Sequence, residues 1–336
     1  MASASIKLAH GSGGRLSNEL INELFFPAFS NPVLNQANDG ALLTMGSRRL
    51  AFSTDSFVVN PYFFPGGNIG DLAVNGTVND IAMCGALPQF LSAAFILEEG
   101  FPIKHLKEIV NSMAAAAQAA QVQIVTGDTK VVERGSADGI FINTSGIGII
   151  THQQQIAPQN AQAGDVVITN GYIGDHGIAI LSQRAGLSFE TTIKSDTAAL
   201  HTLVASILAA SANVHVLRDP TRGGIAGTLN EIAQASQIEI RLEEYALPMR
   251  DSVRAACDLL GLDPLIVANE GKLLAIVPQA DGDAVLQAMR QHPLGRESAI
   301  IGQVLQQHIG KVTLETSIGS LRVVDMPLGE QLPRIC

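Results

Sequence analysis

The sequence predicts a two-domain protein of α+β or α/β class, in which strands and helices alternate in both halves. The first observation is length: at roughly 100 to 200 residues per domain, a chain of 336 residues suggests two domains or one large α/β unit. The second is composition, because 46% hydrophobic and only 15% charged residues supply enough apolar surface for a large core. The third is the pattern, since short apolar runs and helical periods are separated by turns rich in Gly and Pro.

Residues 1–152 form the predicted first domain. The segment from Leu16 to Phe25 has apolar residues at helical spacing, which predicts an amphipathic helix. A β-rich run at 50–59 leads through a turn rich in Pro and Gly to a helix expected over Ile69–Met83. Further strands are expected near 90–97, 122–126 and 139–150, and an Ala-rich helix follows Pro102.

Residues 153–324 form the predicted second domain, and a polar segment at 151–164 that has no periodicity marks the link between the halves. Its expected strands lie at 165–170, 214–217, 238–242, 273–277 and 299–304, and its expected helices at 176–185, 196–211, 223–235, 251–260 and 284–291. The last twelve residues, 325–336, contain two prolines and no packing period. They are therefore predicted to form a mobile tail.

Charge and composition exclude several classes of protein. The net charge is −10, no Lys or Arg run occurs and there is no Trp, so nucleic acid is not an expected partner. No apolar run approaches the ~20 residues that span a bilayer, and the N-terminus lacks a secretory signal. We therefore expect a cytoplasmic protein with no membrane partner. The three cysteines are far apart and the His residues lack ligand spacing, which argues against disulfides and zinc.

Four aspartates occupy positions that a fold alone does not favour. Asp55 lies inside a β-rich run, Asp128 follows an apolar run, and Asp219 precedes a Pro-Thr-Arg-Gly-Gly turn. Asp80 projects onto the small and apolar face of its expected helix. Each alone is explained as well by turn or helix capping. Together, carboxylates at strand ends suit Mg²⁺, which usually binds with a polyphosphate.

Two further residues are candidates for proton transfer. Lys130 follows Asp128 closely, and Glu270 precedes an apolar strand, where partial burial would favour a general base. The alternative, an exposed strand residue and a turn residue, is favoured by spacing alone. No P-loop or Gly-x-Gly-x-x-Gly motif follows a strand, so the glycine clusters at 11–14 and 223–224 are the candidates for phosphate binding.

The C-terminus places a thiol, Cys336, on the final residue of the predicted tail. Packing does not explain a cysteine there, and an exposed thiol suggests chemistry at sulfur. The neighbouring α-carboxylate should favour the neutral thiol. Chance placement is the alternative, and prenylation is excluded because that signal needs three residues after the Cys.

The motifs in order resemble one family along essentially the whole chain. They are His10-Gly11-Ser12-Gly13-Gly14, Ser53-Thr54-Asp55-Ser56, Phe63-Phe64-Pro65-Gly66-Gly67-Asn68-Ile69-Gly70, Asn79-Asp80, Thr126-Gly127-Asp128-Thr129-Lys130-Val131-Val132, Gly174-Asp175-His176-Gly177, Asp219-Pro220-Thr221-Arg222-Gly223-Gly224, Asn269-Glu270-Gly271-Lys272 and Pro333-Arg334-Ile335-Cys336. The chain thus resembles the HypE family of hydrogenase maturation factors, carbamoyl dehydratases among the aminoimidazole ribonucleotide synthetase-like ATPases.

The resemblance implies a fold and an activity. The N-terminal domain would form a β-barrel between two subunits of a homodimer, next to a C-terminal α/β sandwich domain and a flexible tail. The enzyme would use ATP and Mg²⁺ to dehydrate an S-carboxamide on Cys336 to a thiocyanate, the source of the cyanide ligand of nickel-iron hydrogenase. The carbamoyltransferase HypF would load the carboxamide, and a HypC–HypD assembly would receive the cyanide.

The resemblance also implies residue roles. The implied Mg²⁺ ligands are Asp55, Asp80, Asp128 and Asp219. The implied nucleotide-binding residues are Asp55, Asp80, Asp128, Thr129, Asn79, Gly13, Gly14 and Arg222. Cys336, Glu270 and Lys130 would be catalytic, with Lys130 a base or an electrostatic clamp. Two alternatives stay open: another ATPase of the superfamily that phosphorylates a free metabolite, and a thiol carrier without catalysis.

Overall fold

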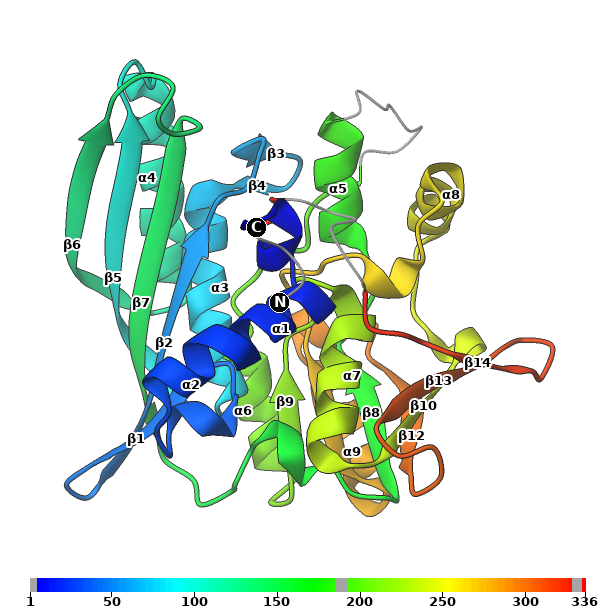
Figure 1. Cartoon of the computed structure of the whole chain (residues 1–336). Coiled ribbons are helices and arrows are strands. Elements are labelled where there is room, and N and C mark those ends of the chain that lie inside the picture. Colours follow the sequence, from blue (N-terminus) through cyan, green and yellow to red (C-terminus); the bar gives the residue numbers. More distant parts are fainter. Residues whose placement is uncertain (1–4, 185–192, 328–333) are drawn as a thin grey trace.

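The computed structural model describes residues 5–184, 193–327 and 334–336, and it has two large sheets with helices packed on them (Figure 1). The first sheet has the strand order β1-β2-β7-β5-β6, in which only β5 and β6 are parallel. Its strands are β1 Ala41–Met45, β2 Arg48–Phe57, β5 Leu87–Glu98, β6 Gln123–Val132 and β7 Ile140–Ile150. The helices of this half are α1 Arg15–Leu20, α2 Phe26–Phe29, α3 Ile69–Met83 and α4 Ile103–Ala119, and β3 Phe63–Phe64 pairs with β4 Gly67–Asn68.

Helix α3 lies between the first sheet and the second half of the chain (Figure 1). A capping box starts it: Asn68 Oδ1 accepts from Gly70 N at 2.8 Å, and Asn68 N donates to Asp71 Oδ1 at 2.7 Å. The observed bounds match the expected helix. All its residues except Asp71 and Asp80 are buried, because elements pack on most of its circumference.

Strand β6 is an exposed edge strand, which corrects the expected strand at 122–126. It continues to Val132, and every residue from Gln123 to Val131 is exposed. Asp128, Thr129 and Lys130 therefore lie within an edge strand rather than beyond its end. The reason is that β6 pairs with β5 along nine registered positions, so the sheet extends it past the apolar run.

The second sheet has the order β14-β13-β10-β12-β8-β11-β9 and forms the core of the second half. Its strands are β8 Asp165–Thr169, β9 Val216–Arg218, β10 Glu239–Glu243, β11 Leu274–Pro278, β12 Ala299–Leu305, β13 Lys311–Glu315 and β14 Leu321–Val323. The helices here are α5 Asp175–Arg184, α6 His201–Ala210, α7 Gly224–Ser236, α8 Asp251–Leu260 and α9 Gln279–Gln291. Strands β1, β3, β4, β13 and β14 were not among the expected elements. None of the described helices is long and apolar enough to cross a membrane.

The expected helix at 196–211 begins only at His201. The residues before it belong to no helix or strand, and the Asn79 side chain of α3 hydrogen-bonds their backbone groups. Asn79 Oδ1 accepts from Leu200 N at 2.8 Å, and its Nδ2 donates to Ala198 O at 3.0 Å and to Glu270 O at 3.1 Å. These hydrogen bonds take the place of the backbone hydrogen bonds of a helical turn, so the helix begins later than expected.

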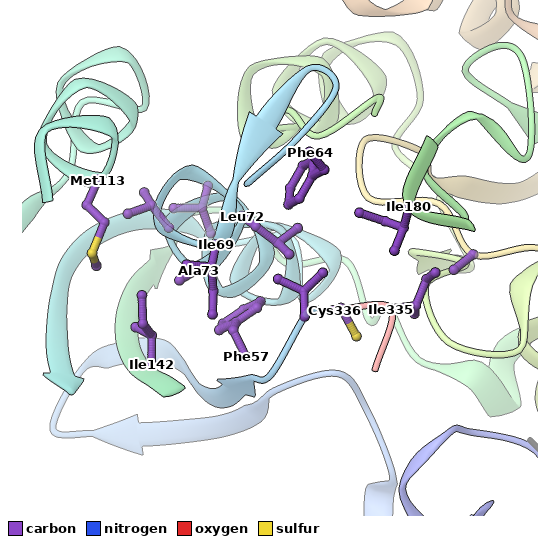
Figure 2. Packing of buried hydrophobic residues seen from close by; sticks show 14 of the residues in the cluster. Phe57, Phe64, Ile69, Leu72, Ala73, Met113, Ile142, Ile180, Ile335 and Cys336 are labelled. Carbon is purple, nitrogen blue, oxygen red and sulfur yellow. The ribbon is translucent and has the colours of Figure 1, made fainter. Parts of the chain in front are cut away.

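The end of the chain is buried between the two halves (Figure 1), which corrects the expectation for its last residues. Ile335 is 2% exposed and Cys336 8%, and both belong to a core cluster with Phe57 and Ile180. Figure 2 shows them between the side chains of the first half and Ile180 of α5. The rest of the predicted tail at 328–333 lies outside the described residues.

Candidate active site

A polar cavity of about 360 Å³ lies between the two halves of the molecule. Its size falls within the range of small-molecule sites. The N-terminal segment, β2, α3, the turn after β9, Glu270 and the chain end all contribute to it. The lining residues are His10, Gly11, Gly13, Ser17, Asn18, Ile21, Asp39, Thr54, Asp55, Gly76, Asp80, Arg218, Asp219, Thr221, Arg222, Thr228, Glu231, Glu270 and Cys336.

Three of the four predicted aspartates reach this cavity from different elements. Asp55 comes from the inward-facing row of β2, Asp80 from α3 and Asp219 from the end of β9. Ser53, also inward on β2, donates to Asp80 Oδ2 at 2.7 Å. Gly76 lies one turn before Asp80 and lines the same wall, so the small-residue face of α3 is where the carboxylate meets the cavity.

Glu270 is held in the wall by its backbone. Its N–H donates to Asp196 Oδ1 at 3.1 Å. At the next residue, Gly271, a Cβ would lie 1.8 Å from the Asp196 carbonyl oxygen, so only glycine fits this close approach. The Glu270 side chain is 4% exposed, and its Oε1 has no hydrogen-bond partner among the described residues.

The cavity has more carboxylates than compensating charges. Burial, and then the charges of Asp219, Asp55 and Asp39, hold the pKa of Asp80 well above its usual range. Burial and the Asp219 and Asp55 carboxylates likewise raise the pKa of Glu270. Burial raises the pKa of Asp219 to about 6. In such a site, carboxyl groups that are protonated or bound to a cation are more stable than free carboxylates.

Arg222 and the N-terminal glycines close one side of the cavity. Arg222 Nη2 lies 4.0 Å from Asp55 Oδ1, and Nη1 donates to Gly11 O at 3.3 Å. Gly13 has a φ of +76°, and a Cβ there would lie 2.9 Å from Arg222 Cβ, so this contact needs glycine. Gly14 instead caps α1, where Arg15 N donates to Pro327 O at 3.0 Å.

Cys336 brings its thiol into the cavity wall. Val58 N donates to a terminal carboxylate oxygen of Cys336 at 3.0 Å, and His176 Nε2 donates to Ile335 O at 2.8 Å. Burial raises the pKa of the thiol more than Arg222 lowers it. The thiol is therefore protonated at neutral pH, as the sequence predicted, but burial is the main cause.

Sequence reasoning missed an ion-pair network at the back of the cavity. Arg218 is 15% exposed; its Nε lies 2.6 Å from Asp39 Oδ1 and its Nη2 lies 2.9 Å from Glu231 Oε2. A signal existed for two of these residues. Asp39 stands in an Asn-Asp-Gly turn before a strand, and Arg218 precedes the predicted Asp219.

Five predicted site residues do not line the cavity, and one of them is Gly14 at the start of α1. Asn79 is 1% exposed, and its side-chain amide forms hydrogen bonds with backbone groups of the second half. Asp128, Thr129 and Lys130 lie on exposed β6, where Lys130 Nζ contacts Asp128 Oδ2 at 2.6 Å. Within one chain, these three residues are separate from the carboxylates of the cavity (Figure 1).

The cavity residues fit a hard cation in type. Among the described residues no three Asp, Glu, His or Cys side chains lie close enough together to hold one metal ion. Carboxylate oxygens are nevertheless the ligands Mg²⁺ prefers, and the buried Asp39 Oδ2 and Glu270 Oε1 have no hydrogen-bond partner. These orphaned oxygens are suited to a cation that enters together with a nucleotide.

Comparison with known families assigns the class. The N-terminal domain of AIR synthase related proteins matches residues 37–150, and their C-terminal domain matches residues 162–315. The chain belongs to the AIR synthase related proteins, which confirms the predicted two-domain α/β fold.

Individual relatives define the family within this class. The chain is 55% identical to the carbamoyl dehydratase HypE of Cupriavidus necator over 99% of this chain and 95% of that protein. It is 48% identical to the carbamoyl dehydratase HypE of Escherichia coli, covering 99% of each. The chain belongs to the HypE family, as its motifs predicted.

Solved structures agree with this assignment. The HypE chain of a HypE–HypF complex superposes with a TM-score of 0.88 at 48% identity, covering 92% of this chain and 99% of that one. A HypE in complex with ATP superposes with a TM-score of 0.83 at 49% identity, covering 99% of this chain and 100% of that one.

Proposed function

We propose that this chain carries out the ATP-dependent carbamoyl dehydratase reaction on its own C-terminus, in the maturation of nickel-iron hydrogenase. The S-carboxamide of Cys336 would become a thiocyanate and supply the cyanide ligand. One observation carries the assignment to Cys336: the terminal thiol lines the same cavity as Glu270, Asp55, Asp80 and Asp219. A tethered substrate gains effective concentration and needs little binding energy of its own.

The chemistry divides into two balanced steps. The carboxamide oxygen attacks the γ-phosphorus of ATP, the bond to ADP breaks, and one N–H proton is lost, which gives an O-phosphorylated imidate on the sulfur. The C–O bond then breaks, the second nitrogen proton leaves with the phosphate, and the C≡N bond forms. Phosphorylation is needed because oxide is a poor leaving group.

Glu270 is the proposed base for the first proton. Burial and the neighbouring carboxylates raise its pKa, which makes its carboxylate a stronger base. Its unpartnered Oε1 is free to accept a proton from the carboxamide nitrogen. Arg222, which lies near both Asp55 and the chain end, is placed to balance charge on the transferred phosphoryl group.

Mg²⁺ is proposed as the cation that accompanies ATP. Asp55, Asp80 and Asp219 would supply ligands together with the phosphates of ATP, since no three of the described side chains lie close enough to hold one ion by themselves, and Asp39 is a further oxygen donor in the same cavity. When bound, the metal would neutralise charge on the phosphates during transfer. The chain's own contribution is an array of buried, under-compensated carboxylates that a divalent cation relieves.

A homodimer is proposed because the first sheet has an open edge and an exposed apolar face. Strand β6 offers an unpaired edge, and Phe52, Ile147 and Phe90 form an exposed apolar row on the face away from α3. Pairing with a second copy would cover both and close a barrel. Asp128, Thr129 and Lys130 would then serve the cavity of the partner subunit.

Two protein partners complete the proposed cycle. A relative was solved as a HypE–HypF complex, and HypF is proposed to load the carboxamide on Cys336. A HypC–HypD assembly is proposed to take the cyanide. Both steps require the chain end to leave the cavity.

The test follows the mass of the Cys336 peptide in carbamoylated protein before and after ATP is added. Loss of one water that depends on ATP is expected, with ADP formed in equal amount. The Cys336→Ala variant should form no thiocyanate and bind ATP as tightly as the wild type. ADP formation without loss of water from this peptide would contradict the proposal.

A further inference from the structure

The chain end runs alongside residues 58–60 in one register. Val58 N donates to a terminal carboxylate oxygen of Cys336 at 3.0 Å, and Asn60 N donates to Arg334 O at 3.3 Å. Arg184 also donates to the carbonyl oxygens of both Asn60 and Arg334. Backbone hydrogen bonds of this kind are the same for every residue type, so they would also form if the tail were shifted along residues 58–60. A side chain must therefore set the register.

Arg334 makes the contacts that can do so. Its Nε donates to Val58 O at 2.9 Å, its Nη1 pairs with Asp138 Oδ2, and its guanidinium lies 5.9 Å from the centre of the Phe141 ring. Arg334 has a φ of +50°, a left-handed backbone conformation that residues other than glycine rarely adopt. Its surroundings therefore hold it in place.

Asp138 joins both sides of this pairing. The same Oδ2 that pairs with Arg334 accepts from Asn60 Nδ2 at 3.1 Å. Asp138 belongs to the turn between β6 and β7 and is not among the residues that line the cavity. Because it lies outside the cavity, its effect on catalysis would pass through the pairing of the tail with residues 58–60.

We propose that Arg334 and Asp138 form a latch that positions the docked tail, so that the group on the Cys336 sulfur meets the cavity in one register. The proposal rests on the proposed function, because it assumes that the substrate is carried on this sulfur. Both residues are positioning residues. The Arg334 side chain is 27% exposed and that of Asp138 52%, and an ion pair so open to water is weak and screened by salt. A weak latch suits a tail that must also leave to be loaded and unloaded.

The first test uses Asp138→Asn, with the tail carbamoylated chemically by cyanate so that loading needs no partner protein. The single-turnover rate of thiocyanate formation should fall roughly three- to tenfold, with ATP affinity unchanged. Asp138→Glu, which keeps the charge, should recover most of the rate. Asp283→Asn, an exposed residue of α9, is the matched control and should react like the wild type.

Salt and a double-mutant cycle separate a latch from a merely structural role. Added salt should slow the wild type more than Asp138→Asn, because only the wild type has the Arg334–Asp138 ion pair to screen. The double variant with Arg334→Gln should be no slower than the slower single variant. Additive losses, or a wild-type rate in Asp138→Asn at low salt, would overturn the latch. Failure of the loaded wild type to form thiocyanate would instead overturn the proposed function.

Discussion

Strands β2 and β6 each carry an aspartate among apolar and hydroxyl residues, yet the two carboxylates lie in opposite environments. Asp55 of β2 faces α3, and burial raises its pKa. Asp128 of β6 lies on the outer, exposed side of the sheet, and its hydrogen bond with Lys130 lowers its pKa. One carboxylate is left without sufficient counter-charge and the other is neutralised within its own strand. The comparison indicates that the cavity is built to receive positive charge, whereas β6 presents an already balanced pair.

The largest expected effect is the loss of the cavity's proposed base. Glu270→Gln should lower the rate of dehydration by about 10²- to 10⁴-fold, the typical contribution of general base catalysis. ATP affinity, measured by calorimetry, should change little. Glu108→Gln on exposed α4 serves as the control. A variant with near-normal turnover would remove Glu270 from the proposed mechanism.

The second prediction addresses where β6 acts. If Lys130 serves the cavity of a partner subunit, mixing the inactive Lys130→Ala and Glu270→Gln proteins should restore activity, since each mixed dimer has one intact site. Random exchange of equal amounts gives roughly a quarter of wild-type activity. No recovery after verified subunit exchange would place Lys130 with the cavity of its own chain or outside catalysis.

The third prediction concerns stability and pH. Asp80→Asn should weaken Mg²⁺-dependent ATP binding at least tenfold, an effect of about 1.4 kcal/mol or more. Without metal it should raise the melting temperature by roughly 2–4 °C, as about 1 kcal/mol would. A carboxyl with a raised folded-state pKa binds more protons when folded, so it lowers the unfolding free energy as pH rises above its unfolded pKa.

The stabilisation by Asp80→Asn should therefore be larger at neutral pH than near pH 4, where Asp80 is protonated in the folded protein. Thermal melts across this range in a chelating buffer measure it. Equal stabilisation at both ends would show that packing rather than charge limits this site, and unchanged calorimetric affinity for MgATP would exclude Asp80 as a ligand.

The smallest expected effect is at Asp128, the exposed aspartate of β6. In protein diluted until it is monomeric, Asp128→Asn should leave the urea midpoint unchanged within error, because Asp128 and Lys130 are both solvent-exposed in the single chain and water replaces their pairing. Measurable destabilisation would mean that the pair is buried in the protein in solution, and the same measurement over a range of protein concentrations would show whether a second copy covers it.

Local sequence determined the elements whose signals lie within a few residues. The capping box at Asn68 and Asp71 and the apolar period after it placed α3 at 69–83, and the β-rich run placed Asp55 within a strand. The ordered motifs were enough to indicate the family, because each is short but their sequence along the chain is specific.

Only the tertiary structure decided which of these side chains meet. Asp39 and Arg218 entered the cavity, Asn79 became a brace for the second half, and the Asp128 strand was placed on an outer edge. The thiol at Cys336 was predicted as exposed chemistry and is instead buried beside Val58. The physical reason is distance along the chain: periodicity and capping act over about four residues. The packing that joins residues 58 and 336 depends on how two separately patterned halves bury their apolar faces together.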